Sequence, residues 1–230
     1  MSGEQASVPA GLLRVTAPVS LGQCWLVPRL QPLLARWQQL HLSITLTDRV
    51  TDLVEENFDL AIRIGNELPP GLVARELCRV SYVLVASPSH LRAHPAPKHP
   101  SELVGRPCIV LGYGAFRGEL VFRHRSSDEQ VSVRTSGPLD VNNGGAILAA
   151  AEVGMGIGVT PDFTAAAALR SGSVLPVLSE WRLEGPYQER PMNALYAPTR
   201  HLSRKVRVVI DWLLDGAPPS SRTDNAGRAR

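Results

Sequence analysis

The feature that most constrains the fold is a repeated alternation of short apolar segments with longer amphipathic ones. Strands are predicted at residues 12–17, 43–47, 60–64, 80–86, 108–111, 120–123, 130–135, 156–160, 174–178 and 192–196. Helices are predicted at residues 21–40, 50–57, 145–153, 162–169 and 202–214. Strands that alternate with helices predict parallel sheets covered on both faces, which is an α/β fold. A Pro- and His-rich stretch at 90–101 separates two such groups and predicts two lobes, with a ligand site in the cleft between them.

Two local patterns refine this prediction. Pro28 and Pro32 lie inside the apolar periodicity of the first helix, so that helix is expected to be kinked or irregular in its first turns. The step Ser126–Glu129 is polar and lies between two short apolar runs, and it predicts the turn of a hairpin.

Composition excludes several classes of protein. Of the 230 residues, 44% are hydrophobic and 20% are charged, as in an ordinary globular chain. The net charge is +3, but residues 216–230 hold three Arg and one Asp, so residues 1–215 carry only 3 − 2 = +1. This balance disfavours the clustered basic face of a nucleic-acid-binding protein. Residues 1–10 and the polar tail 216–230 are expected to be disordered.

The expected location is the cytoplasm. The sequence has no apolar run of about 18 residues, the length needed to span a bilayer, and it begins without the pattern of a secretory signal. Cys24, Cys78 and Cys108 are few, odd in number and set among apolar residues. They are expected to be reduced and buried, and not disulfide-bonded.

Three strand-to-helix junctions share one chemistry. Thr16–Ser20 ends a strand with hydroxyls that can cap a helix, Asn142–Gly144 offers an Asn cap before glycine, and Thr160–Asp162 offers a Thr cap followed by Pro. Backbone N–H groups at helix starts favour anions, and ligands of open α/β sheets lie at the carboxyl ends of the strands. The junctions therefore indicate either a site for a small carboxylate or phosphate, or ordinary helix caps.

Other chemistries are disfavoured. The run Gly154–Val159 resembles a dinucleotide-binding loop but lacks the third glycine, and it follows a helix and precedes a strand, so it is expected to end that helix. His90, His94 and His99 have metal-like spacing, but three prolines break the local frame and a solvated loop is expected. Since no nucleophile–base pair can be named, we expect no catalytic residue, no metal and no cofactor.

Several segments together resemble the effector-binding domain of LysR-type transcriptional regulators over residues 11–215. Any one of them is weak evidence, whereas their order and spacing are specific. The segments are LRVTAPVS (13–20), DRVTDLVEE (48–56), FDLAIRIG (58–65), LVASP (84–88), NNG (142–144), GMGI (154–157) and HLSRKV (201–206).

The resemblance implies a type 2 periplasmic-binding-protein-like fold, in which two Rossmann-like lobes are joined by crossover strands. Lobe I would comprise 11–86 plus 190–215 and lobe II 87–189, with crossovers at Ser87–Pro88 and near Pro191. A small effector would lie in the interlobe cleft. The residues expected to line that cleft are Pro18, Val19, Ser20, Thr47, Asp48, Arg63, Ile64, Gly65, Asn142, Asn143, Gly144 and Pro161. Arg63 could bind a carboxylate of the effector or brace the lobe by pairing with Asp48 or Asp59, and both roles stay open.

The resemblance also implies partners. A homodimer or tetramer is expected, with no membrane association. DNA would be contacted only through a winged helix-turn-helix that is not present in these residues. The alternative function is a stand-alone solute-binding protein of the same fold, and an enzyme ranks third.

Overall fold

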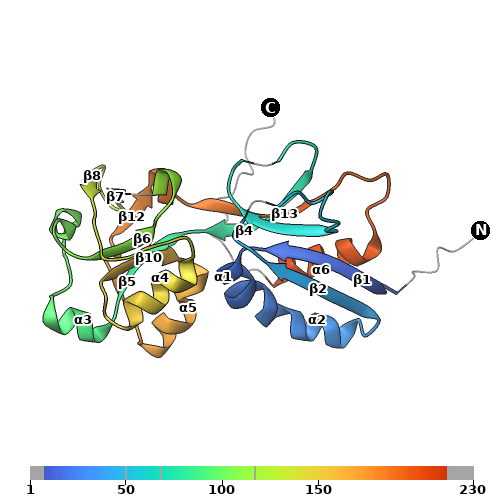
Figure 1. Cartoon of the computed structure of the whole chain (residues 1–230), viewed down its shortest axis with the longest axis horizontal. Coiled ribbons are helices and arrows are strands. Elements are labelled where there is room, and N and C mark those ends of the chain that lie inside the picture. The colour runs from blue at the N-terminus through green and yellow to red at the C-terminus, as the bar shows by residue number, and fades with distance from the viewer. Residues whose placement is uncertain (1–7, 50, 68, 117, 217–230) are drawn as a thin grey trace, which may run out of the picture. The chain divides into compact units, whose positions relative to one another are not determined.

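The structure is a computed structural model that describes residues 8–49, 51–67, 69–116 and 118–216 (Figure 1). The described chain divides into two compact units. The first comprises the residues up to Pro18, Leu26–Arg79 and those from Pro191 onward, and the second comprises Val19–Trp25 and Val80–Arg190. Of the segments predicted to be disordered, residues 1–7 and 217–230 lie outside the described residues. Within the described part, Pro9 is buried.

The first unit is built on one five-stranded sheet, whose order is β2-β1-β3-β13-β4. Its strands are β1 (Gly11–Ala17), β2 (Leu40–Leu46), β3 (Leu60–Ile64), β4 (Val73–Val80) and β13 (Arg190–Tyr196). Strand β1 pairs in parallel with both β2 and β3, whereas β13 pairs antiparallel to β3. The prediction of a purely parallel sheet is therefore wrong here, because the chain enters β13 from the second unit and not through a crossover helix.

The segment predicted as one helix at 21–40 is a series of short pieces. Helix α1 (Val19–Leu21) is followed by a π-helical turn, a 3₁₀ turn at Val27–Arg29 and helix α2 (Leu30–Arg36). Pro28 lies in the 3₁₀ turn, which confirms the expected irregular start. The predicted length is wrong, because β2 already begins at Leu40.

Within the helix predicted at 50–57, residues 53–57 form turns and not a helix, and residue 50 lies outside the described residues. The Asp52 carboxylate accepts from the N–H groups of Val54 and Glu55, which closes one turn. The stretch offers little apolar surface for a helix to bury, since Val54 is 67% exposed. Helix α6 (Arg204–Asp215) is the contrasting case, because it has an apolar face to bury. Its buried residues recur at helical spacing and are Val206, Val209, Ile210 and Leu213. The helix contacts β1.

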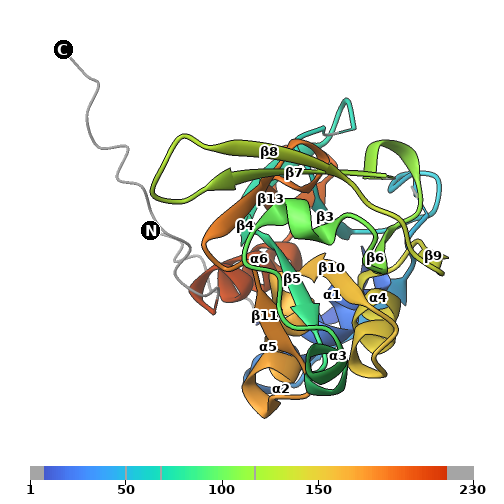
Figure 2. The same cartoon turned by 90° about the vertical axis from the view of Figure 1, so that its left-hand side faces the viewer.

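The second unit contains two sheets (Figure 2). The five-stranded sheet has the order β11-β5-β10-β6-β9, with β5 (Tyr82–Ala86), β6 (Cys108–Leu111), β9 (Asp140–Val141), β10 (Ile157–Pro161) and β11 (Leu175–Val177). Here β6 pairs in parallel with β9 and β10, whereas β5 pairs antiparallel to β10 and β11. The other sheet has the order β12-β7-β8 and is fully antiparallel, with β7 (Glu119–His124), β8 (Gln130–Arg134) and β12 (Trp181–Glu184).

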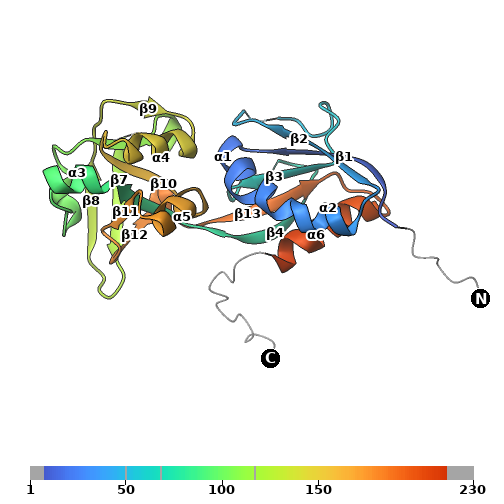
Figure 3. The same cartoon turned by 90° about the horizontal axis from the view of Figure 1, so that it is seen from below.

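The predicted hairpin at Ser126–Glu129 is confirmed, since it joins β7 to β8 (Figure 2). The helices of this unit are α3 (Pro88–Ala93), α4 (Gly144–Glu152) and α5 (Asp162–Ser171), with 3₁₀ turns at Pro100–Leu103, Gly114–Phe116 and Gly185–Tyr187. Figure 3 shows α4 and α5 close to β10, and both helices contact that strand. Val85, Ala151 and Ala165 fill the space between the helices and the sheet.

The glycines after α4 end that helix, as predicted. Gly154 has a φ of +85° and its N–H bonds back to the Ala151 carbonyl at 3.0 Å. A Cβ added to Gly156 would lie 2.3 Å from the Pro107 carbonyl oxygen, so only glycine allows this approach of the two backbones.

The three cysteines are free, as predicted. Cys78 and Cys108 are buried, but Cys24 is exposed, contrary to the prediction.

Candidate functional site

The expected ligand residues of the first unit gather where three parallel strands end. Strands β1, β2 and β3 end at Ala17, Leu46 and Ile64, and their parallel pairing brings these ends to one edge of the sheet. The Thr47 N–H donates to the Ala17 carbonyl at 2.9 Å, so the chain after β2 stays against the end of β1. This edge therefore collects Pro18, Thr47, Asp48, Arg63, Ile64 and Gly65 from separate parts of the sequence.

Arg63 is the cation among these residues, and neutral oxygen atoms accept hydrogen bonds from its guanidinium. Its Nη2 donates to the hydroxyls of Thr16 and Thr51, at 3.1 and 2.7 Å, and its Nη1 donates to the Ile62 carbonyl at 3.0 Å. The two threonines are buried and Arg63 itself is half-buried. The position of the cation is therefore fixed by groups that do not neutralise it.

The pKa of Arg63 and the contacts of the neighbouring carboxylates show how far its charge is balanced. Burial lowers the pKa of the Arg63 guanidinium from its ordinary value, and the nearby Asp48 and Glu56 carboxylates oppose that shift without reversing it. Asp59, the other proposed partner, is engaged elsewhere, since it accepts from the Arg14 N–H and forms an ion pair with Lys205 at 3.1 Å. A half-buried cation held this way is suited to bind an anion.

The chain around Arg63 is also fixed. Gly65 follows β3 with a φ of +146°, which glycine adopts readily, and its N–H donates to the Pro191 carbonyl at 3.0 Å. The Asn193 side chain on β13 donates to the Gly65 carbonyl at 3.0 Å. Ile64 and Gly65 are half-buried at the end of β3, and Asp48 is exposed after β2.

The expected residues of the second unit also gather at strand ends. Strands β9 and β10 flank β6 and run parallel to it, so Asn142 after β9 and Pro161 at the end of β10 lie at one edge. The Asn143 side-chain oxygen accepts from the N–H groups of Gly145 and Ala146, at 2.9 and 3.2 Å, and so caps α4 as predicted. These two N–H groups are thereby already bonded.

The third junction differs from its prediction. Thr160 does not cap α5; its hydroxyl donates to the Gly144 carbonyl at 3.0 Å, and Pro161 takes the cap position without a side-chain bond. The reason is that β10 runs through Pro161, so the helix starts one residue later than the Thr cap requires. Thr160 instead ties the end of β10 to the start of α4.

Helix α1 completes this edge. It contacts both α4 and α5, and a Cβ added to Gly145 would lie 3.8 Å from the Ser20 Cβ. A Cβ added to Gly144 would lie 2.9 Å from the Pro161 ring, so the junctions pack tightly. Val19 is half-buried and Ser20 is buried at this helix start. The starts of α1, α4 and α5 thus converge within the second unit.

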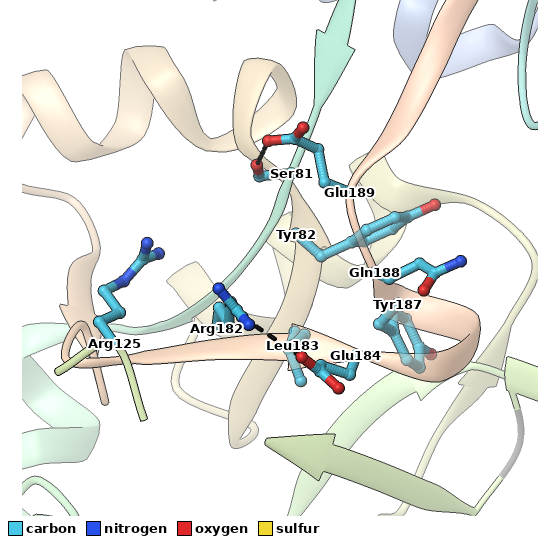
Figure 4. A pocket seen from close by; sticks show the side chains of 9 residues that line it. All are labelled: Ser81, Tyr82, Arg125, Arg182, Leu183, Glu184, Tyr187, Gln188 and Glu189. Carbon is cyan, nitrogen blue, oxygen red and sulfur yellow. Dashed lines mark hydrogen bonds and ion pairs between the residues drawn. The ribbon is translucent and has the colours of Figure 1, made fainter. Parts of the chain in front are cut away.

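A pocket of about 420 Å³ opens on the second unit, and it contains none of the expected residues (Figure 4). It is lined by Ser81, Tyr82, Arg125, Arg182, Leu183, Glu184, Tyr187, Gln188 and Glu189. Burial raises the pKa of Tyr82 to about 12, so its phenol stays protonated at neutral pH. No pattern in the sequence pointed to this pocket, because its residues come from three separate segments.

Metal-binding groups are not evident in the described part of the chain, where no three His, Cys, Asp or Glu side chains come together to hold an ion. The His90 and His94 rings lie 5.0 Å apart, and the His90 Nδ1 is 3.3 Å from the Gly154 carbonyl oxygen. Within the same residues, no helix is long and apolar enough to span a membrane.

Comparison with known families identifies the chain. Residues 6–218 match the model of the LysR substrate binding domain. The chain belongs to the LysR substrate-binding domain family. It is 30% identical over 217 residues to the probable transcriptional regulator LtrA of Klebsiella pneumoniae, covering 94% of this chain and 69% of that protein. It is 32% identical over 211 residues to the transcriptional regulator DmlR of Escherichia coli, covering 90% of this chain and 65% of that protein.

Solved structures agree with this assignment. The full-length virulence activator AphB of Vibrio cholerae is 27% identical, with a TM-score of 0.75 over 90% of this chain and 69% of that chain. The regulatory domain of CrgA from Neisseria meningitidis is 24% identical, with a TM-score of 0.78 over 90% of this chain and 98% of that chain, which supports the fold alone. The predicted family and the predicted α/β, periplasmic-binding-protein-like fold of this LysR domain are confirmed.

Sequence reasoning missed the residues that position Arg63 and α4. Thr51 lies in a segment predicted to be helical, so its hydroxyl was not expected near β3. Thr16 and Thr160 were considered only as helix caps, whereas both bond across the strand ends. Asn193 sits in a strand distant in sequence, and only the antiparallel pairing of β13 with β3 brings it to Gly65.

Proposed function

We propose that this LysR domain senses a small anion, such as a carboxylate, and controls transcription through a conformational or oligomeric change. The ligand would lie in the cleft expected between the two lobes. Its walls would be the strand ends of the first unit and the helix starts of the second. The curated relatives are transcriptional regulators of which the chain spans about two thirds, 69% and 65% for the two compared.

The observation that supports this proposal most is the Arg63 guanidinium. Hydroxyl and carbonyl oxygens fix it, while the Asp59 carboxylate is bonded elsewhere. Bracing of Arg63 through Asp59 is therefore disfavoured, whereas the Asp48 carboxylate lies near enough to raise the pKa of Arg63 and could share the cation with a ligand. A guanidinium that is already oriented binds a carboxylate with two parallel hydrogen bonds at little cost in side-chain entropy.

The response would follow from differential binding. An effector shifts a two-state domain only by the difference between its affinities for the two states. Because the proposed walls come from different units, a ligand bound to both would favour the state that brings them together. The change would pass to a partner subunit in a dimer or tetramer and reach DNA through a helix-turn-helix outside these residues, in the cytoplasm.

The experiment is a thermal-shift screen of the purified chain against small carboxylates, aromatic acids, sugars and phosphates. A ligand at a hundred times its Kd adds about 2.7 kcal/mol of stability, which is readily measured. We expect the strongest shift from an anion, and we expect Arg63→Met to reduce it by at least about half. Arg14→Met, which removes an exposed arginine from the same sheet, should leave the shift unchanged.

Two results would contradict the proposal. One is a strongest hit that is a neutral sugar, since Arg63 would then have no charge to recognise. The other is an anion whose shift persists in Arg63→Met at an unchanged Kd, measured by isothermal titration calorimetry.

A further inference from the structure

The pocket of the second unit combines two arginines with an aromatic wall, and this chemistry is separate from the proposed effector site. Its volume of about 420 Å³ lies within the range of about 300–1,000 Å³ that is usual for small-molecule sites. Its arginines come from β12 and from the residue that follows β7, and its glutamates come from β12 and from the residue before β13. Its aromatic residues come from β5 and the 3₁₀ turn at Gly185–Tyr187.

The strand register brings the arginines to one face of the sheet. Arg182 on β12 lies opposite Arg123 on β7, and Arg125 follows two residues later, so its side chain points to the same face. Diagonal neighbours of this kind lie about 7–8 Å apart at their backbones, within reach of two long side chains. Figure 4 shows Arg125 and Arg182 on the same side of the pocket.

Both guanidinium groups are held in a way that leaves donors for a ligand. Arg125 donates from Nε to the Ser179 carbonyl at 3.0 Å, and Arg182 donates from Nε to Glu184 at 3.3 Å. Among the described residues, neither side chain uses its terminal nitrogens in a hydrogen bond. A guanidinium anchored through Nε is restrained and can still donate twice to a carboxylate.

The carboxylates that line the pocket are already engaged. Glu184 accepts from Arg123 at 2.7 and 3.2 Å and also from Arg182, and hydrogen bonding to Arg123 lowers the pKa of its carboxyl group. The Ser81 hydroxyl donates to Glu189 at 3.2 Å. Glu184 is thus shared between Arg123 and Arg182, and the donors that remain open to an anion are the terminal nitrogens of Arg125 and Arg182.

The apolar wall is the ring of Tyr82. It packs edge-to-face on Tyr187, with 5.2 Å between the ring centroids, and Tyr187 is fixed because its hydroxyl accepts from the Leu111 N–H at 3.0 Å. We propose that this pocket is a second ligand site, which binds a small aromatic carboxylate with its charge on Arg125 and Arg182 and its ring against Tyr82.

The position of the pocket gives such a ligand a regulatory role. Ser81 and Glu189 lie next to two of the four places where the chain passes between the units, at Arg79–Val80 and at Arg190–Pro191. The hydrogen bond between their side chains joins these two connecting segments, and Asp162 holds Ser81 through bonds in both directions between the two residues. A ligand in the pocket would contact both segments and restrain them.

The experiment uses benzoate as the probe and the Trp181 indole as the reporter. The chain has four tryptophans, and Trp181 precedes Arg182 on β12, so its indole N–H signal, assigned with Trp181→Phe, reports locally in ¹H–¹⁵N spectra. We expect a saturable shift with a Kd below about 10 mM, which corresponds to a binding free energy of about −2.7 kcal/mol. Benzamide, which has the same shape without the charge, should bind at least tenfold more weakly.

Variants then assign the site. The double change Arg125→Gln with Arg182→Gln should weaken benzoate binding at least tenfold, whereas Arg134→Gln, an exposed arginine on β8 of the same sheet, should not change it. In the wild-type chain, benzoate should also slow hydrogen exchange at the amides of Ser81 and Gln188. Binding that leaves these amides unchanged would overturn the restraint of the connecting segments.

Other outcomes would overturn the site itself. They are the lack of a saturable Trp181 shift below about 10 mM benzoate, or a shift that survives the double change. A shift lost in Arg63→Met and kept in the double variant would place benzoate at the effector site and reject this pocket. Loss only in the double variant would support the pocket whether or not the proposed function holds.

Discussion

The two units each gather polar residues at the carboxyl ends of parallel strands, but they do so by different means. In the first unit the central group is a side-chain cation, Arg63, which donates to Thr16 and Thr51. In the second unit the central group is Asn143, whose oxygen accepts from two backbone N–H groups of α4. The edge of the first unit thus holds a charged group in place, whereas the edge of the second unit uses its side chain to bond the N–H groups at the start of α4.

A strand-to-helix motif in the sequence can indicate either a helix cap or an anion site, and the structure distinguishes the two roles. A capped helix start keeps the favourable dipole for an anion, but its most accessible donors are already used. A half-buried cation fixed by neutral oxygens keeps its full charge. We therefore expect the first unit to supply most of the anion affinity and the second unit to supply shape and packing.

Gly144→Ala should give the largest effect, on stability. The added Cβ would lie 2.9 Å from the Pro161 ring and 3.2 Å from the Thr160 hydroxyl, neither of which ends a flexible chain. Overpacking of this kind costs about 1–3 kcal/mol, and chemical denaturation should measure the loss. Gly145→Ala is the matched comparison: its closest contact is the Asn143 side-chain oxygen at 3.0 Å, so its cost should not exceed that of a lost N-cap, about 1 kcal/mol. Equal losses in both variants would show that the second edge is not tightly packed.

Arg63→Met should give the largest effect on ligand binding. Hydrogen bonds to charged groups contribute about 1.5–3 kcal/mol, so the Kd of the anion found in the screen should rise about tenfold to a hundredfold. The free energy of unfolding should change by less than about 1 kcal/mol, since the variant also removes a desolvated charge. A loss of stability with unchanged affinity would instead assign Arg63 a structural role and would remove the proposed asymmetry between the two edges.

The sequence predicted most strands and the longer helices because each has a clear periodicity; β3 and β6 have the predicted bounds, 60–64 and 108–111. It failed where tertiary contacts decide. Residues 51–57 carry helix-forming residues, but only Thr51 and Leu53 are buried, so a single Asp52-capped turn forms in place of a helix. The strands β4, β9 and β12 are not predicted. Strand β9 has only two residues and β4 carries several exposed charged ones, whereas β12 alternates apolar and polar residues over only four positions, too few to stand out.

In the candidate site, too, local features could be predicted from the sequence and tertiary contacts could not. Local motifs predicted the Asn143 cap, since an N-cap depends only on neighbouring residues. They could not predict the threonines around Arg63, because Thr16 and Thr51 reach it across 47 and 12 residues of chain. The expected ligand residues remain a prediction that the binding experiments test.

Thr51→Val tests whether the hydroxyl holds the cation. This nearly isosteric change removes the 2.7 Å bond to Arg63 at a buried position and should cost about 1–2 kcal/mol of stability. Anion affinity should also fall, by less than in Arg63→Met, because the charge stays and only its orientation loosens. Thr45→Val on β2 is the control, since that threonine is exposed and valine favours strands. If the two changes cost the same, Thr51 does not orient Arg63.

Asn143→Ala should give the smallest effect and should act mainly on stability. Loss of an N-cap costs about 1 kcal/mol, which guanidinium chloride unfolding followed by circular dichroism can measure. Asn143→Asp should retain stability, because the carboxylate still accepts from the N–H groups of Gly145 and Ala146 and interacts favourably with the helix dipole. The same Asp should weaken anion binding by repulsion if the ligand lies at this edge. A variant that is stable and binds the anion with unchanged affinity would place the ligand on the Arg63 edge alone.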